Sequence, residues 1–172
     1  FLKASLAAMA ATSMSCRLQT SPKRRRGLRI GLVTDCHYAD ADIKGSRHYR
    51  HSLDKLAQRV DPMNTEEVDL LIELGDFKAQ NPPPEESRTP DYLRSVESVF
   101  QQFKGPTYHA LGNHDLDSIS KTQFLANVTN TDIDPRSSYY SFDLAGLHFV
   151  VLDPNYTSAG ENYNHGNFNW TD

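Results

Sequence analysis

Three short polar clusters hold the side chains best suited to chemistry in this sequence. In chain order they are Asp35-Cys36-His37, Gly75-Asp76 and Gly112-Asn113-His114-Asp115. Their oxygen and imidazole donors suit Zn, Mn or Fe, whereas a soft-metal site would be built from thiolates. The spacing Asp-x-His places alternate side chains on one face of an extended segment, so we expect Asp35 and His37 to bind one ion. Cys36 would then point away from that ion.

Each polar cluster follows an apolar run that is typical of a buried strand. These runs cover residues 28–34, 68–74 and 108–111. The carboxyl ends of parallel strands lie at the same edge of a sheet, and ligands of open α/β sheets bind at this edge. Asp or Asn at a single strand end is commonly only a turn or helix cap. Five metal-donor residues at three successive strand ends favour a common site instead.

Two amphipathic helices are predicted between these strands. Leu53, Leu56, Ala57 and Val60 recur at helical spacing, which predicts a helix from about Arg47 to Val60 that ends before Pro62. Leu93, Val96, Phe100 and Phe103 form a second stripe, with Pro90 just ahead of the helix start. Alternating strands and helices indicate a parallel α/β sheet. Farther along, residues 139–153 predict a hairpin that turns at Ala145-Gly146.

In this order the three clusters resemble the D-x-H, G-D and G-N-H-[DE] blocks of the calcineurin-like metallophosphoesterases. The resemblance covers the chain from Leu28 to about Asp115. The later stretches 147–153 and 166–170 are similar to the subgroup related to manganese-dependent ADP-ribose and CDP-alcohol pyrophosphatases. No phosphate-binding P-loop, dinucleotide-binding glycine motif, serine-hydrolase elbow or H-E-x-x-H motif occurs in the sequence.

The resemblance implies a four-layer α-β-β-α sandwich, of which residues 28–172 form the N-terminal part, and a site for two divalent ions (Mn, Fe or Zn). It assigns Asp35 and His37 to the first ion, Asp76 as a bridge, and Asn113 to the second ion. It places His114 over the substrate as an electrostatic or proton-donating group that Asp115 orients. Two such ions hold a phosphoryl oxygen and activate a water molecule. The implied enzyme hydrolyses small phosphate mono- or diesters or a nucleotide pyrophosphate.

Two departures from the family pattern leave an alternative open. Ala79 stands where family members often carry an acidic residue, and the later histidine and Gly-His-x-His block do not occur before Asp172. The alternative is therefore a non-catalytic protein of the same fold that binds metal or phosphate. We expect residues 1–172 on their own to be an inactive fragment.

The remaining histidines and cations have mostly structural interpretations. We expect His48, His51 and His109 to pack, cap or face solvent, and His148 to be an ordinary sheet residue. His165 lies in a polar loop and is the one further candidate for substrate contact. Lys78 and Arg47 could attract phosphate, although charged loop residues are usually only solvated.

The first 27 residues predict export rather than catalysis. Residues 1–11 form a weakly apolar run of small residues after Lys3, and Phe1-Leu2-Lys3 is similar to the end of a bacterial twin-arginine signal. Ala8-Met9-Ala10 fits a cleavage site, lipidation of Cys16 is a weaker alternative, and 21–27 reads as a basic linker. We therefore expect a periplasmic or cell-surface location.

Composition excludes several other classes of protein. The chain has 172 residues, a net charge of −4 and two cysteines, which is too few for a disulfide scaffold. Its longest weakly polar run is shorter than the roughly 20 residues that span a bilayer. Residues 1–26 contain six basic residues and no acidic ones. The rest of the chain has 12 basic and 22 acidic residues, and this negative charge disfavours nucleic-acid binding.

Overall fold

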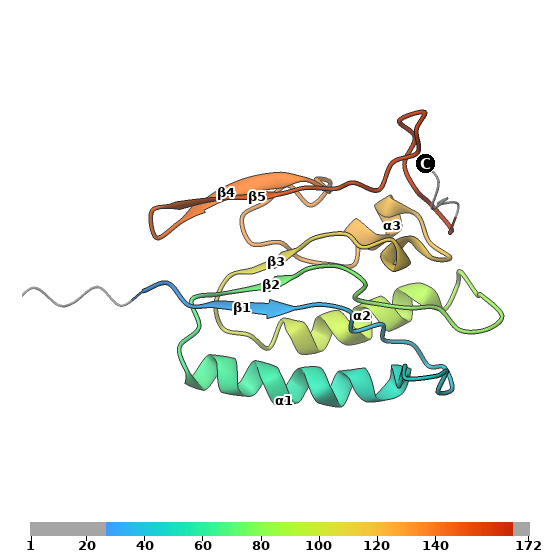
Figure 1. The fold of residues 1–172 in the computed structure, drawn as a ribbon, viewed down its shortest axis with the longest axis horizontal. Helices are drawn as coiled ribbons and strands as arrows, with labels where there is room; N and C mark the ends of the chain where they lie inside the picture. The colour runs from blue at the N-terminus through green and yellow to red at the C-terminus, as the bar shows by residue number, and fades with distance from the viewer. Residues whose placement is uncertain (1–26, 167–172) are drawn as a thin grey trace, which may run out of the picture.

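A parallel sheet of three strands lies at the centre of the computed structural model, which describes residues 27–166 (Figure 1). Strands β1 (Ile30–Val33), β2 (Leu70–Glu73) and β3 (Thr107–His109) pair in the order β1-β2-β3. Ile30 is opposite Leu70, and Leu71 is opposite Thr107. The predicted parallel sheet is confirmed, and the carboxyl ends of its strands meet at one edge.

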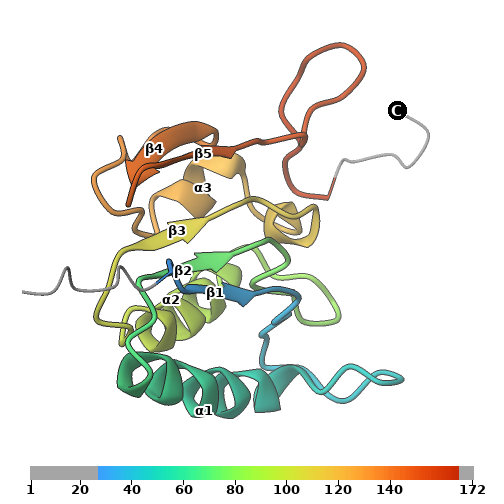
Figure 2. The same ribbon diagram turned by 60° about the vertical axis from the view of Figure 1, so that its left-hand side comes forward.

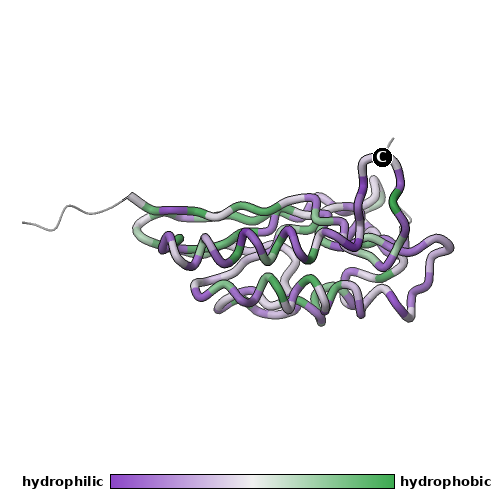
Figure 3. Tube along the Cα trace, turned by 90° about the horizontal axis from the view of Figure 1, so that it is seen from below, coloured by the Kyte–Doolittle hydropathy of each residue, from purple (hydrophilic) through white to green (hydrophobic). Residues whose placement is uncertain are grey.

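Two helices cover one face of this sheet. A 3-10 turn, η1 (Tyr49–His51), leads into α1 (Ser52–Thr65), and α2 (Thr89–Phe100) lies beside it (Figure 1). Figure 3 shows apolar and polar segments alternating along the helices, as amphipathic helices require. The buried cluster between helices and sheet includes Leu56, Val60, Leu71, Leu93, Val96 and Phe100.

A hairpin covers the opposite face of β2 and β3 (Figure 2). Strands β4 (Tyr140–Leu144) and β5 (Leu147–Val151) are antiparallel, and the turn residues Ala145 and Gly146 have φ angles of 53° and 83°. This confirms the predicted hairpin. The Phe142 ring stacks 3.6 Å from the Tyr108 ring of β3, which attaches the hairpin to the sheet.

The described residues therefore form helix, sheet and hairpin layers of an α/β fold. Two short elements complete it: the 3-10 turn η2 (His114–Leu116) and α3 (Lys121–Leu125). Ser120 caps α3 through a reciprocal capping box with Gln123. These layers agree with the N-terminal part of the layered α/β sandwich that the sequence predicted; within residues 27–166 no helical layer covers the outer face of the hairpin.

Three local predictions were wrong. Helix α1 continues through the exposed Pro62 to Thr65, because Met63 extends the apolar stripe onto the core and its packing compensates for the hydrogen bond that proline cannot donate. Pro90 lies within the first turn of α2, where proline is tolerated, and not ahead of the helix start. Phe103 was predicted to belong to the helical stripe, but it lies beyond the last helical residue, Phe100. Strand β1 is not fully buried: Leu32 is 57% exposed because the hairpin lies over β2 and β3.

The predicted export signal, its cleavage site, Cys16 and most of the basic linker lie outside the described residues. The stretch 167–172 lies outside them as well. Between residues 27 and 166, no helix has the length and apolar character needed to cross a membrane.

Candidate metal centre

Three predicted ligands converge where β1 and β2 end. Ligand atoms of Asp35, His37 and Asp76 all lie within 4.8 Å of one another. The His37 Nε2 atom is 3.5 Å from Asp35 Oδ1 and 3.6 Å from Asp76 Oδ2. Both separations exceed good hydrogen-bond lengths and match two ligands that share an ion at about 2.1 Å. The donor set fits a divalent cation such as Mn, Fe or Zn.

The backbone brings these ligands together in a way that the sequence did not predict. Asp35, His37 and Asp76 have φ angles of 56°, 44° and 60°, so they adopt left-handed conformations rather than an extended strand. Main-chain bonds support this geometry: the His37 amide donates to the Asp76 carbonyl oxygen at 2.9 Å. Such conformations are costly for non-glycine residues and concentrate at functional sites.

Cys36 points away from the three ligands, as expected, and packs against the core cluster. Burial, reinforced by the charge of Glu73, raises the pKa of its thiol to about 12. The thiolate form that binds metals is therefore disfavoured.

The loops that follow β2 and β3 touch through their main chains. A Cβ atom on Gly75 would lie 2.6 Å from the Gly112 nitrogen, and one on Gly112 would collide with the Asp76 amide and carboxylate. The His114 amide donates to Asp76 Oδ1 at 2.9 Å. Asn113 directly precedes His114 in the chain, and its buried Nδ2 atom has no hydrogen-bond partner within the described residues.

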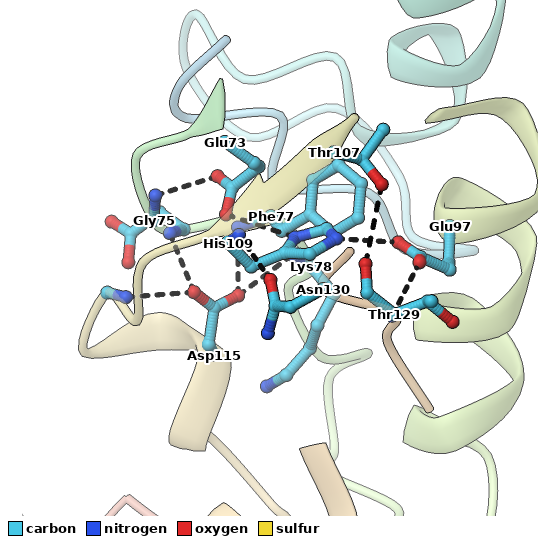
Figure 4. Close-up of polar contacts among 12 residues, drawn as sticks. Glu73, Gly75, Phe77, Lys78, Glu97, Thr107, His109, Asp115, Thr129 and Asn130 are labelled. Atoms are coloured by element: carbon cyan, nitrogen blue, oxygen red, sulfur yellow. Dashed lines mark hydrogen bonds and ion pairs between the residues drawn. The ribbon is translucent and has the colours of Figure 1, made fainter. Parts of the chain in front are cut away.

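Asp115 organises these two loops instead of orienting His114. Its Oδ2 accepts hydrogen bonds from the amides of Asp76 and Gly112, both at 2.9 Å (Figure 4). Its Oδ1 accepts from Phe77 at 2.8 Å and Lys78 at 3.2 Å. Burial raises the pKa of this fully buried carboxyl to about 6. The predicted contact between Asp115 and the His114 ring is wrong, because all of these bonds go to main-chain amides.

Asp117 is the residue that orients His114, and the sequence analysis missed it. Asp117 Oδ2 lies 2.6 Å from His114 Nδ1, and this hydrogen bond raises the pKa of the imidazole. The His114 ring packs edge-on to His37, with 5.0 Å between ring centroids. The spacing His-x-x-Asp across a 3-10 turn was the available signal. The catalytic role of His114 remains a prediction.

Lys78 and Ala79 both have structural roles. Lys78 is fully buried, and its Nζ donates to the carbonyl oxygens of His114 at 2.6 Å and Asp117 at 2.7 Å. Lys78 is therefore neither solvated nor placed to attract phosphate, the two roles that the sequence left open for it, and burial lowers its pKa to about 8. Ala79 packs in a small apolar cluster with Ala39, Ala41 and Tyr92, so no acid supports Asp76 from this position.

Arg47 is exposed and lies at the rim of the site. It lines a cavity of about 560 Å³ together with Asp35 and His37, and one of about 270 Å³ together with His114 and Asp117. Burial and the positive charge of Arg47 lower the pKa of His37. The neutral imidazole is the form that binds a metal.

The other histidines follow their expected roles. His48 and His51 are exposed and stacked, and His148 is an exposed sheet residue beside Asp143. His165 lies 3.3 Å from Glu86 and lines a cavity of about 540 Å³ with His114 and Asp117, so it stays a candidate for substrate contact. His109 is packed as expected, against Phe77 and Phe100, but the sequence did not predict that it would be buried between two glutamates.

Comparison with known proteins identifies the family. The model for calcineurin-like phosphoesterases matches residues 28–171. The chain belongs to this family. Among calcineurin-like phosphoesterases, it is similar to a manganese-dependent ADP-ribose/CDP-alcohol diphosphatase of Oryza sativa, with 32% identity over 72% of the chain and 40% of the relative. The protein of the same name from Bos taurus is 26% identical over 77% of the chain and 46% of its own length.

The chain thus spans less than half the length of these two relatives. A crystal structure of a dimetal phosphatase from Danio rerio superimposes with a TM-score of 0.47 and 25% identity, over 58% of this chain and 33% of the other.

Proposed function

We propose that the protein carrying this chain hydrolyses a phosphoester or nucleotide diphosphate with divalent cations bound at the ends of β1 and β2. The observation that carries this proposal is the convergence of Asp35, His37 and Asp76 within 4.8 Å, in a chain of the calcineurin-like phosphoesterase family. The names of the relatives favour manganese as the cation and ADP-ribose or a CDP-alcohol as the substrate.

We assign the ligand roles that the family resemblance implies, and the convergence of Asp35, His37 and Asp76 supports them. Asp35 and His37 would hold one ion, Asp76 would share its carboxylate between two, and Asn113 would contribute to the second. When bound, such ions polarise a phosphoryl oxygen and activate water. The chain itself fixes the position of Asp76, because Asp115 accepts hydrogen bonds from the Asp76 amide and from the Gly112 amide of the neighbouring loop.

His114 would supply a proton to the departing oxygen. Asp117 is hydrogen-bonded to its Nδ1, so we assign the transferred proton to the other ring nitrogen, Nε2. As the bond between phosphorus and the leaving oxygen breaks, the Nε2 proton would pass to that oxygen. Arg47, exposed at the rim, would attract the negatively charged diphosphate.

The test uses the whole protein that carries this chain. The metal-free protein is titrated with Mn²⁺ and then assayed with ADP-ribose, CDP-choline and p-nitrophenyl phosphate, with Asp76→Asn as the inactive control. We expect Mn²⁺-dependent release of AMP from ADP-ribose. Tight Mn²⁺ binding without hydrolysis of any substrate would favour the non-catalytic alternative, and absence of Mn²⁺ binding would refute the proposed site.

A further inference from the structure

A line of three ionisable side chains is buried beside the proposed metal centre. Glu73 ends β2, His109 ends β3, and Glu97 belongs to α2 (Figure 4). His109 Nε2 lies 3.1 Å from Glu97 Oε2, and His109 Nδ1 lies 3.8 Å from Glu73 Oε2. These contacts are ion pairs rather than well-aligned hydrogen bonds. Glu73, His109 and Glu97 are only 0%, 3% and 7% exposed, so all three are withdrawn from water.

The far end of this line is firmly anchored. Glu97 Oε1 accepts hydrogen bonds from Gln101 Nε2 at 2.8 Å and from the Thr129 amide at 2.9 Å. The His109 amide donates to Asn130 Oδ1 at 2.7 Å, which fixes the backbone that carries the imidazole. Burying these groups costs free energy that the contacts must offset. A buried, anchored imidazole can hold a neighbouring carboxyl group in one orientation.

The near end of the line reaches the loop that carries Asp76. Glu73 Oε1 accepts a hydrogen bond from the Gly75 amide at 2.7 Å. Gly75 has a φ angle of 108° and directly precedes Asp76, whose φ angle is 60°. The two oxygens of Glu73 therefore have different partners: one faces His109, and the other holds the amide in front of the bridging ligand.

We infer that Glu73, held in place by His109, is a positioning residue that directs the Asp76 carboxylate through the Gly75 amide. The inference rests on the metal site proposed above. Asp115 fixes the amides from Asp76 to Lys78, and Glu73 fixes the one position just before them. The left-handed turn is thus held at its entrance by Glu73 and along its length by Asp115.

A matched pair of variants isolates the hydrogen bond. Glu73→Leu and Glu73→Gln both remove the charge beside His109 and have similar side-chain volumes, but only glutamine keeps an oxygen that can accept the Gly75 proton. Glu97→Gln changes the same line of side chains at its far end and serves as the control.

Two readouts are measured on the whole protein. Mn²⁺ affinity is obtained by electron paramagnetic resonance titration, and amide hydrogen exchange of residues 74–77 is followed in the metal-free state. Loss of a group that orients a ligand typically weakens metal binding by about 10- to 100-fold. We expect that loss, and faster exchange at Gly75, in Glu73→Leu, with both values near wild type in Glu73→Gln and Glu97→Gln.

Equal exchange rates at Gly75 in Glu73→Leu and Glu73→Gln would overturn the inference. If the wild-type protein binds Mn²⁺, equal Mn²⁺ affinity of these two variants would overturn it as well. A wild-type protein that binds no Mn²⁺ would refute the proposed function. In that case the exchange comparison still decides the role of Glu73, because it needs no metal.

Discussion

Nδ1 of His114 lies 2.6 Å from Oδ2 of Asp117, the residue three positions later in the chain. Asp115, only one position away, directs its carboxylate to four main-chain amides instead. The 3-10 turn His114–Leu116 produces this division, because with three residues per turn it aligns positions i and i+3. Two neighbouring acids therefore have separable roles, one toward the imidazole and one toward the backbone.

Replacing Asp117 should affect turnover rather than folding. In Asp117→Asn the partner of His114 Nδ1 is uncharged, so the imidazole is less well oriented and less readily protonated. We expect turnover to fall by about 10- to 100-fold with Mn²⁺ binding retained. Asp115→Asn is the comparison: it should lower the free energy of unfolding by about 3 kcal/mol, because the new side-chain NH2 group cannot accept a hydrogen bond from the two buried amides that it faces. Urea unfolding that ranks the two variants in the opposite order would contradict this division.

Replacing Asp76 should remove metal and activity together. The Asp76 carboxylate lies close to the His37 imidazole through Oδ2 and accepts a hydrogen bond from the His114 amide through Oδ1. Asp76→Asn therefore weakens the whole site. Metal content by atomic emission and turnover are measured on the same preparation. His114→Ala should instead keep its metal and lose rate by ~10²–10⁴, as for removal of an acid–base group. Retention of both ions and of turnover in Asp76→Asn would disprove the bridging assignment.

A single methyl group at Gly112 should disrupt the site. In Gly112→Ala the new Cβ collides with the amide and carboxylate of Asp76, so one of the two loops must move. We expect a loss of about 1–3 kcal/mol in the free energy of unfolding, together with weaker Mn²⁺ binding. Gly27→Ala is the matched control, because no atom lies within 4 Å of its added Cβ. Equal behaviour of the two variants would show that the loops do not touch in solution.

The buried His109 predicts a pH dependence of stability. Burial opposes its charge, but Glu73 and Glu97 outweigh that effect and raise the pKa of His109 to about 9. The folded state then keeps a proton that the unfolded chain releases near pH ~6.5. The resulting stabilisation is fully present below that pH and is lost as the pH rises through about 9.

Urea unfolding followed by circular dichroism between pH 6 and 10 measures this effect. We expect the free energy of unfolding to decrease on the order of 2 kcal/mol across this range, and the slope to flatten in His109→Gln. His48→Gln, a change of an exposed histidine, should follow the wild-type curve. A flat wild-type curve would mean that His109 carries no proton in the folded state.

Local sequence patterns predicted the framework of the site. The strands, the hairpin turn at Ala145-Gly146 and the meeting of Asp35 with Asp76 depend on apolar runs and on the common edge of a parallel sheet. The end of α1 was wrong because packing of Met63 against the core outweighed the local signal of Pro62.

The features that the sequence could not predict depend on contacts between distant segments. From the sequence, Lys78 is indistinguishable from a solvated loop lysine. In the structure its buried ammonium group donates hydrogen bonds to the carbonyl oxygens of residues 114 and 117. Glu73, His109 and Glu97 come from three different elements, and no local pattern links them. The left-handed turns at Asp35 and His37 are likewise stabilised by main-chain bonds to the loop after β2.

The contact between Gly75 and Gly112 makes the two ligand-bearing loops a single mechanical unit. A shift of one loop is passed to the other through these main-chain atoms and through the Asp115 carboxylate, which accepts hydrogen bonds from both loops. The two glycines contact no ion in the proposed site, yet a side chain at either position would push apart the loops that carry Asp76 and Asn113.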